Sequence, residues 1–311
     1  MKETQIVFLI LPQIHLLDLA GADQVMYEAI EHGIPVKIQY CSIATSVTTS
    51  THLPFGNIQH FSSIQLTKGD YLIIPGAETT YLLSEELGLE KSLFQWILTA
   101  HEDEVNICSI CTGAFLLARV GVLDGKLCTT HWKKTGQLQQ LFPKLKVIDN
   151  ILYTEDEGVF TSAGVTSGID LALNIIGKLT NDMMAYKIAR ELVVYIRRQG
   201  SQSQNSIYLS YRNHIHAGIH KVQDSLIEHL HKKTNLEELA ELANMSARNL
   251  TRLFRKETGV SIHEYLTLLR KEKIGELLKN PDVSRSQIAL QCGLASERQI
   301  SRIMQKGICY E

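Results

Sequence analysis

Short apolar runs alternate with helical segments along the first two thirds of the chain. The apolar run at 6–11 is typical of a buried strand, and a helix is predicted at 22–31, before Gly33. Further strands are predicted at 35–42, 71–74, 105–111, 147–153 and 159–161, and further helices at 92–101, 113–120, 167–179 and 182–198. This alternation predicts an α/β fold, with a doubly wound, mostly parallel, flavodoxin-like sheet between two layers of helices.

The pattern changes after residue 198. Residues 199–206 are all small or polar, which is typical of a linker. From His214 onward, every segment has the period of a helix. We therefore predict an α/β domain at 1–198, a linker at 199–214 and an all-α domain at 215–311.

Two helix-turn-helix units are predicted in the all-α domain. Leu239 and Ala240 lie on the apolar face of one helix, and Thr234 with Glu237 predicts a capping box at its start. The polar turn that follows can end in a serine cap for a second helix. The turn and cap positions are Asn244 and Ser246 in this unit, and the pattern recurs about 49 residues later at Ile288, Ala289, Gly293 and Ser296.

A predicted helix at 262–279, capped by Ser261, joins the two units. At about 1.5 Å per residue it is roughly 27 Å long. That length suits two recognition helices in successive major grooves of a DNA duplex, roughly 34 Å apart. The alternative is an ordinary helical bundle with solvated arginines, and the repetition of the pattern argues against it.

The charge differs between the two parts of the chain. Residues 1–205 carry 15 basic and 21 acidic side chains (15 − 21 = −6), and residues 206–311 carry 16 and 12 (16 − 12 = +4). The basic part is therefore the one expected to meet a polyanion. No apolar run reaches the roughly 18 residues of a membrane span, and the N-terminal run is too short for a signal peptide. We expect a cytoplasmic protein that makes no membrane contact.

The six cysteines are expected to be free thiols, because the chain shows no secretory signal. Cys108 and Cys111 form a C-x-x-C pair, but no second Cys/His pair has zinc spacing, so no metal and no cofactor is predicted. Cys111 lies between a strand and a helix, flanked by Ser109 and Gly113, which is the pattern of a nucleophile elbow. The start of a helix favours the thiolate. The alternative is a buried structural cysteine.

Three other residues also follow predicted strands. Asp18 comes after the first strand, Gly76 follows the strand at 71–74, and His131 follows a short later strand. Ligands bind at the carboxyl edge of an open α/β sheet, so we expect Asp18, Gly76, Cys111 and His131 to form one ligand pocket. The alternatives are a helix cap for Asp18 and a hydrogen-bonded structural role for His131.

Residues 215–306 resemble the AraC/XylS-type DNA-binding domain, with Arg-Lys-Glu-Thr-Gly at 255–259 and Leu-Arg-Lys-Glu-Lys-Ile at 269–274. The resemblance implies two recognition helices on one face of double-stranded DNA. Its base-contacting positions correspond to Arg248, Thr251, Arg252, Glu297, Arg298, Ser301 and Arg302. The family continues into a closing helix beyond the position of Met304, and this sequence does not, so we expect the second unit to be less well supported.

Residues 5–198 resemble the ThiJ/PfpI-type, class I glutamine amidotransferase-like domain. The matching segments are 17–21, 73–77, 111–118, 121–125, 130–132 and 161–170. The resemblance implies that Asp18 lies beside the elbow cysteine, as in isonitrile hydratases. Thr112 stands where the PfpI-type proteases carry a histidine, so no protease dyad is expected.

The domain order is similar to that of the GlxA-type transcriptional regulators. It implies a bacterial DNA-binding regulator, not an enzyme, that dimerises and senses a small-molecule effector of unknown identity. One alternative is an isonitrile-hydratase-like enzyme with Cys111 as the nucleophile and Asp18 as the general acid/base. Another is a thiol redox sensor acting through Cys111. The two helix-turn-helix units favour the regulator, because a stand-alone enzyme has no use for them.

Overall fold

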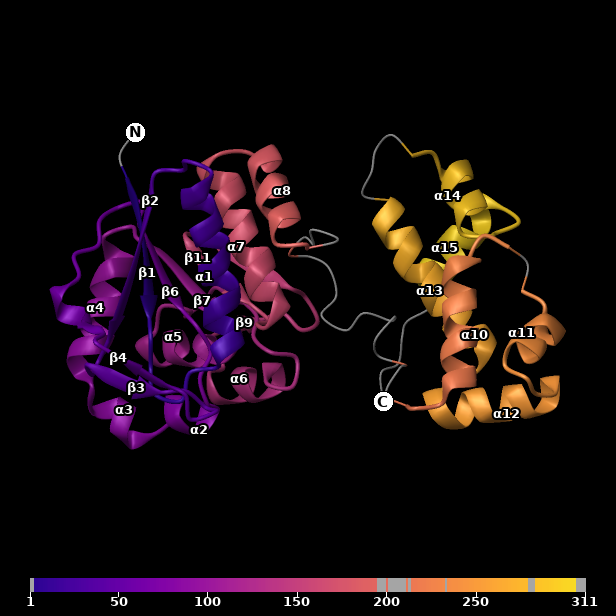
Figure 1. Cartoon of the computed structure of the whole chain (residues 1–311), viewed down its shortest axis with the longest axis horizontal. Coiled ribbons are helices and arrows are strands. Elements are labelled where there is room, and N and C mark those ends of the chain that lie inside the picture. The colour runs from indigo at the N-terminus through magenta and orange to yellow at the C-terminus, as the bar shows by residue number, and fades with distance from the viewer. Residues whose placement is uncertain are drawn as a thin grey trace. The chain divides into compact units, whose positions relative to one another are not determined.

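The computed structural model describes residues 3–194, 200, 211, 214–232, 234–278 and 283–305. The chain forms two compact units, Met1–Gln204 and Asn205–Glu311, which are described separately below (Figure 1). Most of the predicted linker at 199–214 lies outside the described residues. Among the helices of the described segments, none combines the length and the apolar character needed to cross a membrane.

The first unit is built on a seven-stranded sheet in the order β10-β11-β7-β6-β1-β2-β5. Its strands are β1 (Thr4–Leu9), β2 (Val36–Ser42), β5 (Gln59–His60), β6 (Tyr71–Ile74), β7 (Asn106–Ile110), β10 (Tyr153–Asp156) and β11 (Val159–Ser162). All neighbours are parallel except β10 and β11. Two short ribbons accompany the sheet, β3 (Ser46–Thr48) with β4 (Pro54–Gly56) and β8 (Leu127–Cys128) with β9 (Lys146–Val147). The mostly parallel sheet is confirmed.

Helices cover both faces of this sheet (Figure 1). On one face lie α1 (Leu16–Glu31), α7 (Thr166–Leu179) and α8 (Asp182–Glu191), and on the other lie α2 (Thr79–Leu82), α3 (Glu85–Leu89), α4 (Lys91–Glu102), α5 (Ala114–Val120) and α6 (Thr135–Leu141). Successive strand residues point to opposite faces. Ile6 and Phe8 of β1 therefore pack with α1 and α7, while Val7 and Leu9 pack with α4 and α5.

Three predicted element boundaries were wrong. The first helix begins at Leu16 rather than at residue 22, so it includes Asp18. The predicted strand at 147–153 is two strands, because β9 pairs with β8 and β10 pairs with β11. The predicted helix at 182–198 ends at Glu191, and residues 195–198 lie outside the described part of the chain.

The second unit is all helical across its described residues. It contains α10 (Ala217–Glu228), α11 (Leu236–Leu242), α12 (Ala247–Thr258), α13 (Ile262–Leu277), α14 (Arg285–Gln291) and α15 (Glu297–Gln305). The first half of α13 packs with α10, α11 and α12 around Leu250, Phe254 and Tyr265. Its second half, at Ile274, packs with α14 and α15 around Ile288. One helix therefore belongs to the cores of both helix-turn-helix units.

The turns of this unit follow the predicted chemistry. Asn244 has φ 54°, and the Ser246 Oγ accepts a hydrogen bond from the Asn249 amide at 3.3 Å. The predicted cap at Thr234 was wrong, because Asn235 caps α11 by accepting from the Glu237 amide.

Candidate functional sites

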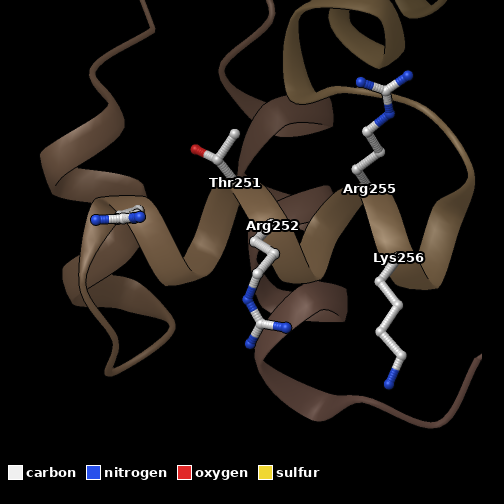
Figure 2. Close-up of a pocket in the computed structure, with 5 residues that line it drawn as sticks. Thr251, Arg252, Arg255 and Lys256 are labelled. Carbon is white, nitrogen blue, oxygen red and sulfur yellow. The ribbon is translucent and has the colours of Figure 1, made fainter.

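A basic groove lies along α12. Arg248, Thr251, Arg252, Arg255 and Lys256 line this groove, which has a volume of about 560 Å³. Arg252 and Lys256 point to one side of the helix, and Thr251 and Arg255 point to the other (Figure 2). All five side chains are exposed, while Leu250 and Phe254 anchor the opposite face of the helix in the core. The fold therefore exposes all three DNA-contacting residues predicted for this helix, Arg248, Thr251 and Arg252, along a single groove.

Two side chains of this basic groove are held by local hydrogen bonds. The Arg252 Nη2 donates to the Asn249 Oδ1 at 3.0 Å, which restrains the guanidinium. The Thr251 Oγ1 donates to the Ala247 carbonyl at 2.9 Å. Asn249 is not among the residues that the sequence predicted to contact DNA. Its position three residues before Arg252, on the same face of the helix, was the one signal in the sequence for this hydrogen bond.

The second predicted set lies on α15. Glu297, Arg298, Ser301 and Arg302 are exposed, and Ile300 is buried on the opposite side of the helix. The Glu297 carboxylate accepts a hydrogen bond from the Ser286 hydroxyl of α14. Glu297 therefore joins the two helices of this unit.

Cys111 occupies the sharp turn between β7 and α5. Its φ of 57° is in the left-handed region, which a residue other than glycine rarely adopts. Gly113 and Gly164 make the turn possible. A Cβ at Gly113 would come within 2.3 Å of the Ile74 carbonyl oxygen, and one at Gly164 within 2.2 Å of the Cys111 Cβ. The geometry is that of a nucleophile elbow.

Asp18 lies in the first turn of α1 and is only 1% exposed. Its Oδ1 accepts a hydrogen bond of 2.6 Å from the Val165 amide, and its buried Oδ2 has no hydrogen-bond partner among the described residues. A Cβ at Gly76 would come within 2.5 Å of that Oδ2 and 2.9 Å of the Cys111 Cβ. Asp18, Gly76 and Cys111 therefore meet as expected. Asp18 is not the helix cap, because the cap position is His15.

His15 is the residue of this pocket that the sequence reading missed. Its Nδ1 lies 3.4 Å from the Asp18 Oδ2, and its Nε2 lies 3.6 Å from the Glu78 Oε1. The close approach of the Asp18 carboxylate raises the pKa of His15 most strongly, and burial opposes it. Donor atoms of His15, Asp18 and Cys111 all lie within 4.8 Å of one another. The signal in the sequence was its position three residues before Asp18, in the segment between the first strand and the first helix.

His131 is not among the described residues whose donor atoms lie within 4.8 Å of one another. Its ring stacks on Trp132 at 5.7 Å, and its Nδ1 accepts from the Lys133 amide at 3.3 Å. Burial lowers the pKa of His131, as does the positive charge of Lys133, while the charge of Asp18 raises it. His131 is thus within the electrostatic reach of Asp18.

The Cys111 thiol is less acidic than its position at a helix start suggested. The side chain is 4% exposed. Burial raises its pKa most strongly and the negative charge of Asp18 raises it further, while hydrogen bonds with Thr112 oppose the shift. Desolvation by burial and the charge of Asp18 therefore outweigh the preference for the thiolate that the helix start provides.

Thr112 holds the loop after β6 instead of serving as a base. Its Oγ1 donates to the Ala77 carbonyl at 2.7 Å and accepts from the Ala77 amide at 3.1 Å. The Thr130 Oγ1 donates to the Cys111 carbonyl at 2.7 Å. These bonds fix the elbow from two sides without supplying a group that could deprotonate the thiol.

Both parts of the chain match known protein families or domains. Residues 4–178 match the DJ-1/PfpI family, and residues 239–307 match a helix-turn-helix domain. The HTH-type transcriptional regulator GbdR of Pseudomonas aeruginosa is 32% identical over 197 residues, which are 62% of this chain and 53% of that protein. This chain therefore spans about half the length of that relative.

Two other proteins resemble the first unit. An isonitrile hydratase of Pseudomonas putida is 31% identical over 175 residues, which are 56% of this chain and 72% of the enzyme. The crystal structure of an AraC family transcriptional regulator from Pseudomonas putida superposes with a TM-score of 0.54 at 18% identity, covering 61% of this chain and 99% of that one. This second likeness supports the fold alone.

Proposed function

Because this chain belongs to the DJ-1/PfpI family and also carries a helix-turn-helix domain, we propose that it is a DNA-binding transcriptional regulator whose first unit binds a small-molecule effector. The observation that carries the proposal is the basic groove on α12. Its four cationic side chains are exposed on the helix that follows the tight turn, which is the helix that enters the major groove in this motif. The name of GbdR agrees with this assignment.

The charges of this groove suit a DNA duplex. Arg252 and Arg248 can each form two hydrogen bonds with a guanine edge, and the methyl group of Thr251 can meet a thymine methyl. Lys256 lies one turn beyond Arg252 and suits a phosphate. Arg298, Ser301 and Arg302 of α15 would supply the second contact, with Glu297 accepting from a cytosine amino group or remaining on Ser286.

The test is binding of the full chain to its own DNA site, recovered by genome-wide mapping of bound fragments. Affinity should fall linearly with the logarithm of salt concentration, since phosphate contacts release counterions. The Arg248→Ala/Arg252→Ala variant should lose selectivity for the recovered site over scrambled DNA. Lys187→Ala, which removes an exposed charge from α8, is the matched control and should bind like the wild type. Equal binding of both variants would refute the assignment of the groove.

The pocket at Asp18, Gly76, Cys111 and His131 is the proposed effector site. An effector changes DNA affinity only if it binds two states of the protein differently.

We also propose that the protein acts as a homodimer, supported by exposed apolar side chains on the adjoining helices α1 and α8. These are Leu17, Tyr27, Met183 and Tyr186, which are 49–65% exposed. Light scattering on the full chain should show a dimer whose dissociation is promoted by Tyr186→Asp.

A second candidate is isonitrile hydration, which the elbow geometry of Cys111 beside Asp18 favours together with the likeness to the hydratase. Cys111 would attack and Asp18 would transfer the proton. Against it stands the raised pKa of the thiol, because an attacking sulfur needs an activating base. The same burial disfavours a thiol redox sensor. Multiple-turnover hydration abolished by Cys111→Ser would establish the enzyme.

A further inference from the structure

The pocket of the first unit presents three different metal-binding groups to one point. These are the imidazole of His15, the carboxylate of Asp18 and the thiol of Cys111, with their donor atoms within 4.8 Å of one another. Nitrogen, oxygen and sulfur donors together are the ligand set that Zn²⁺ accepts, whereas Mg²⁺ and Ca²⁺ prefer oxygen alone. These residues have no metal-binding spacing along the chain, because they come from two distant segments.

A second feature points to the same place. The Asp18 Oδ2 is buried and accepts no hydrogen bond among the described residues, although its partner Oδ1 is held at 2.6 Å by the Val165 amide. The His15 Nδ1 lies 3.4 Å from this oxygen without hydrogen-bond geometry. A cation bound between the two atoms would satisfy a buried carboxylate oxygen that otherwise lacks a hydrogen-bond donor. The pairing of the other oxygen also fixes the carboxylate so that Oδ2 faces His15 and Cys111.

The separations suit a small cation. Two bonds of about 2.0–2.1 Å at a tetrahedral angle place a nitrogen and an oxygen about 3.3 Å apart. The His15 Nδ1 and the Asp18 Oδ2 are 3.4 Å apart. A sulfur at about 2.3 Å from the metal would lie about 3.6 Å from the same nitrogen. The Cys111 Sγ lies within 4.8 Å of the other two donor atoms, so it needs a shift of about 1.2 Å at most.

The glycines of the pocket keep this point open. A Cβ at Gly76 would stand 2.5 Å from the Asp18 Oδ2, and one at Gly164 would stand 2.7 Å from the Cys111 Sγ. His15 is the most exposed of the three residues, with 31% of its side chain accessible. It therefore provides the side from which an ion and a fourth ligand can approach.

We propose that His15, Asp18 and Cys111 form a Zn²⁺ site with a fourth position open to water or to a small ligand. The ion would bind the neutral imidazole, the carboxylate and the thiolate, and the thiol proton would leave to solvent. Three protein ligands and one open position are the arrangement of a zinc that binds a further ligand, in contrast to a closed structural site. The inference goes beyond the proposed function. It rests on that function only in treating this pocket as a ligand site.

The experiment is titration of the metal-free full chain with Zn²⁺ alone, followed by calorimetry and by a competing chromophoric chelator. We expect one ion per chain and release of a proton on binding. His15→Gln, Asp18→Asn and Cys111→Ser should each weaken binding by at least the roughly 10- to 100-fold that loss of an outer-shell partner costs. Asp18→Asn keeps an oxygen for the Val165 amide, so it tests the ligand without removing that bond.

Co²⁺ provides a readout that folding defects do not imitate. The wild-type protein with Co²⁺ should show thiolate-to-cobalt charge-transfer absorption, which His15→Gln should shift and Cys111→Ser should abolish. His60→Gln, which changes an exposed histidine outside the pocket, is the control and should bind like the wild type. Absence of zinc binding by the wild type, or equal binding by all three pocket variants, would overturn the site.

DNA binding is measured on the same preparations. A chain that binds its DNA site but no zinc refutes the metal site and leaves the regulator intact. A chain that binds zinc through the three residues but shows no selective DNA binding supports the metal site while refuting the regulator.

Discussion

Arg252 donates a hydrogen bond to Asn249 on the exposed face of α12, and we predict that replacing Arg252 by alanine costs DNA affinity rather than fold stability. The side chain is exposed, so the free energy of unfolding should change by no more than about 0.5 kcal/mol. A guanidinium that reads a base contributes about 1–3 kcal/mol, which corresponds to a rise in Kd of about 5- to 160-fold at 1.36 kcal/mol per tenfold. Selectivity should relax at one base pair.

The hydrogen bond from Arg252 to Asn249 makes the argument more specific. If Asn249 holds the Arg252 guanidinium in place, Asn249→Ala leaves the Arg252 side chain free to move in the unbound protein. Immobilising that side chain when DNA binds would then cost about 0.5–1.5 kcal/mol. Its Kd should rise by about 2- to 13-fold. The double variant should bind no more weakly than Arg252→Ala alone, because the two residues then act as one unit.

The assay is fluorescence anisotropy on the mapped DNA site and on single-base variants of it, at two salt concentrations. Lys256→Ala is the comparison, because loss of a phosphate contact should weaken binding to all sequences alike and reduce the salt slope by about 0.9. Additive effects of Asn249→Ala and Arg252→Ala would refute the coupling. Wild-type selectivity in Arg252→Ala would refute the base contact.

Three further predictions follow from the two units. Arg302→Ala should raise the Kd for the DNA site less than Arg252→Ala does. The helix α15 also carries the acidic Glu297, and among the described residues its unit buries five core residues, whereas the first unit buries thirteen. An equal rise in Kd in the same anisotropy assay would contradict this. In metal-free protein, Asp18→Asn should lower the pKa of the Cys111 thiol, because the substitution removes a negative charge that raises this pKa. The pH midpoint of iodoacetamide labelling at Cys111 should fall, and an unchanged midpoint would count against the electrostatic contact. Gly164→Ala should destabilise the first unit by about 2–5 kcal/mol, from the positive φ and the 2.2 Å approach to the Cys111 Cβ, and a Tm within about 2 °C of the wild type would argue against this close packing.

Local patterns in the sequence determined the architecture of this protein. The alternation of apolar strands with helical segments predicted the parallel sheet, and the helical period after residue 214 predicted the all-α unit, because residues that face a core recur at the spacing of their element. The turn at Asn244, the cap at Ser246 and the elbow at Cys111 were also readable, since each depends on residues a few positions apart. The exposed residues of α12 followed from the same helical period.

Only the tertiary structure decided the chemistry of the pocket. His15 became part of it because the loop after β1 brings its ring to Asp18 and, across the sheet edge, to Cys111. The thiol pKa depends on how completely neighbouring segments exclude water, which the residues at the helix start do not encode. The bonds from Val165 to Asp18 and from Ser286 to Glu297 join residues 147 and 11 positions apart. Contacts of this kind arise from packing between elements, which the period of a single element does not encode.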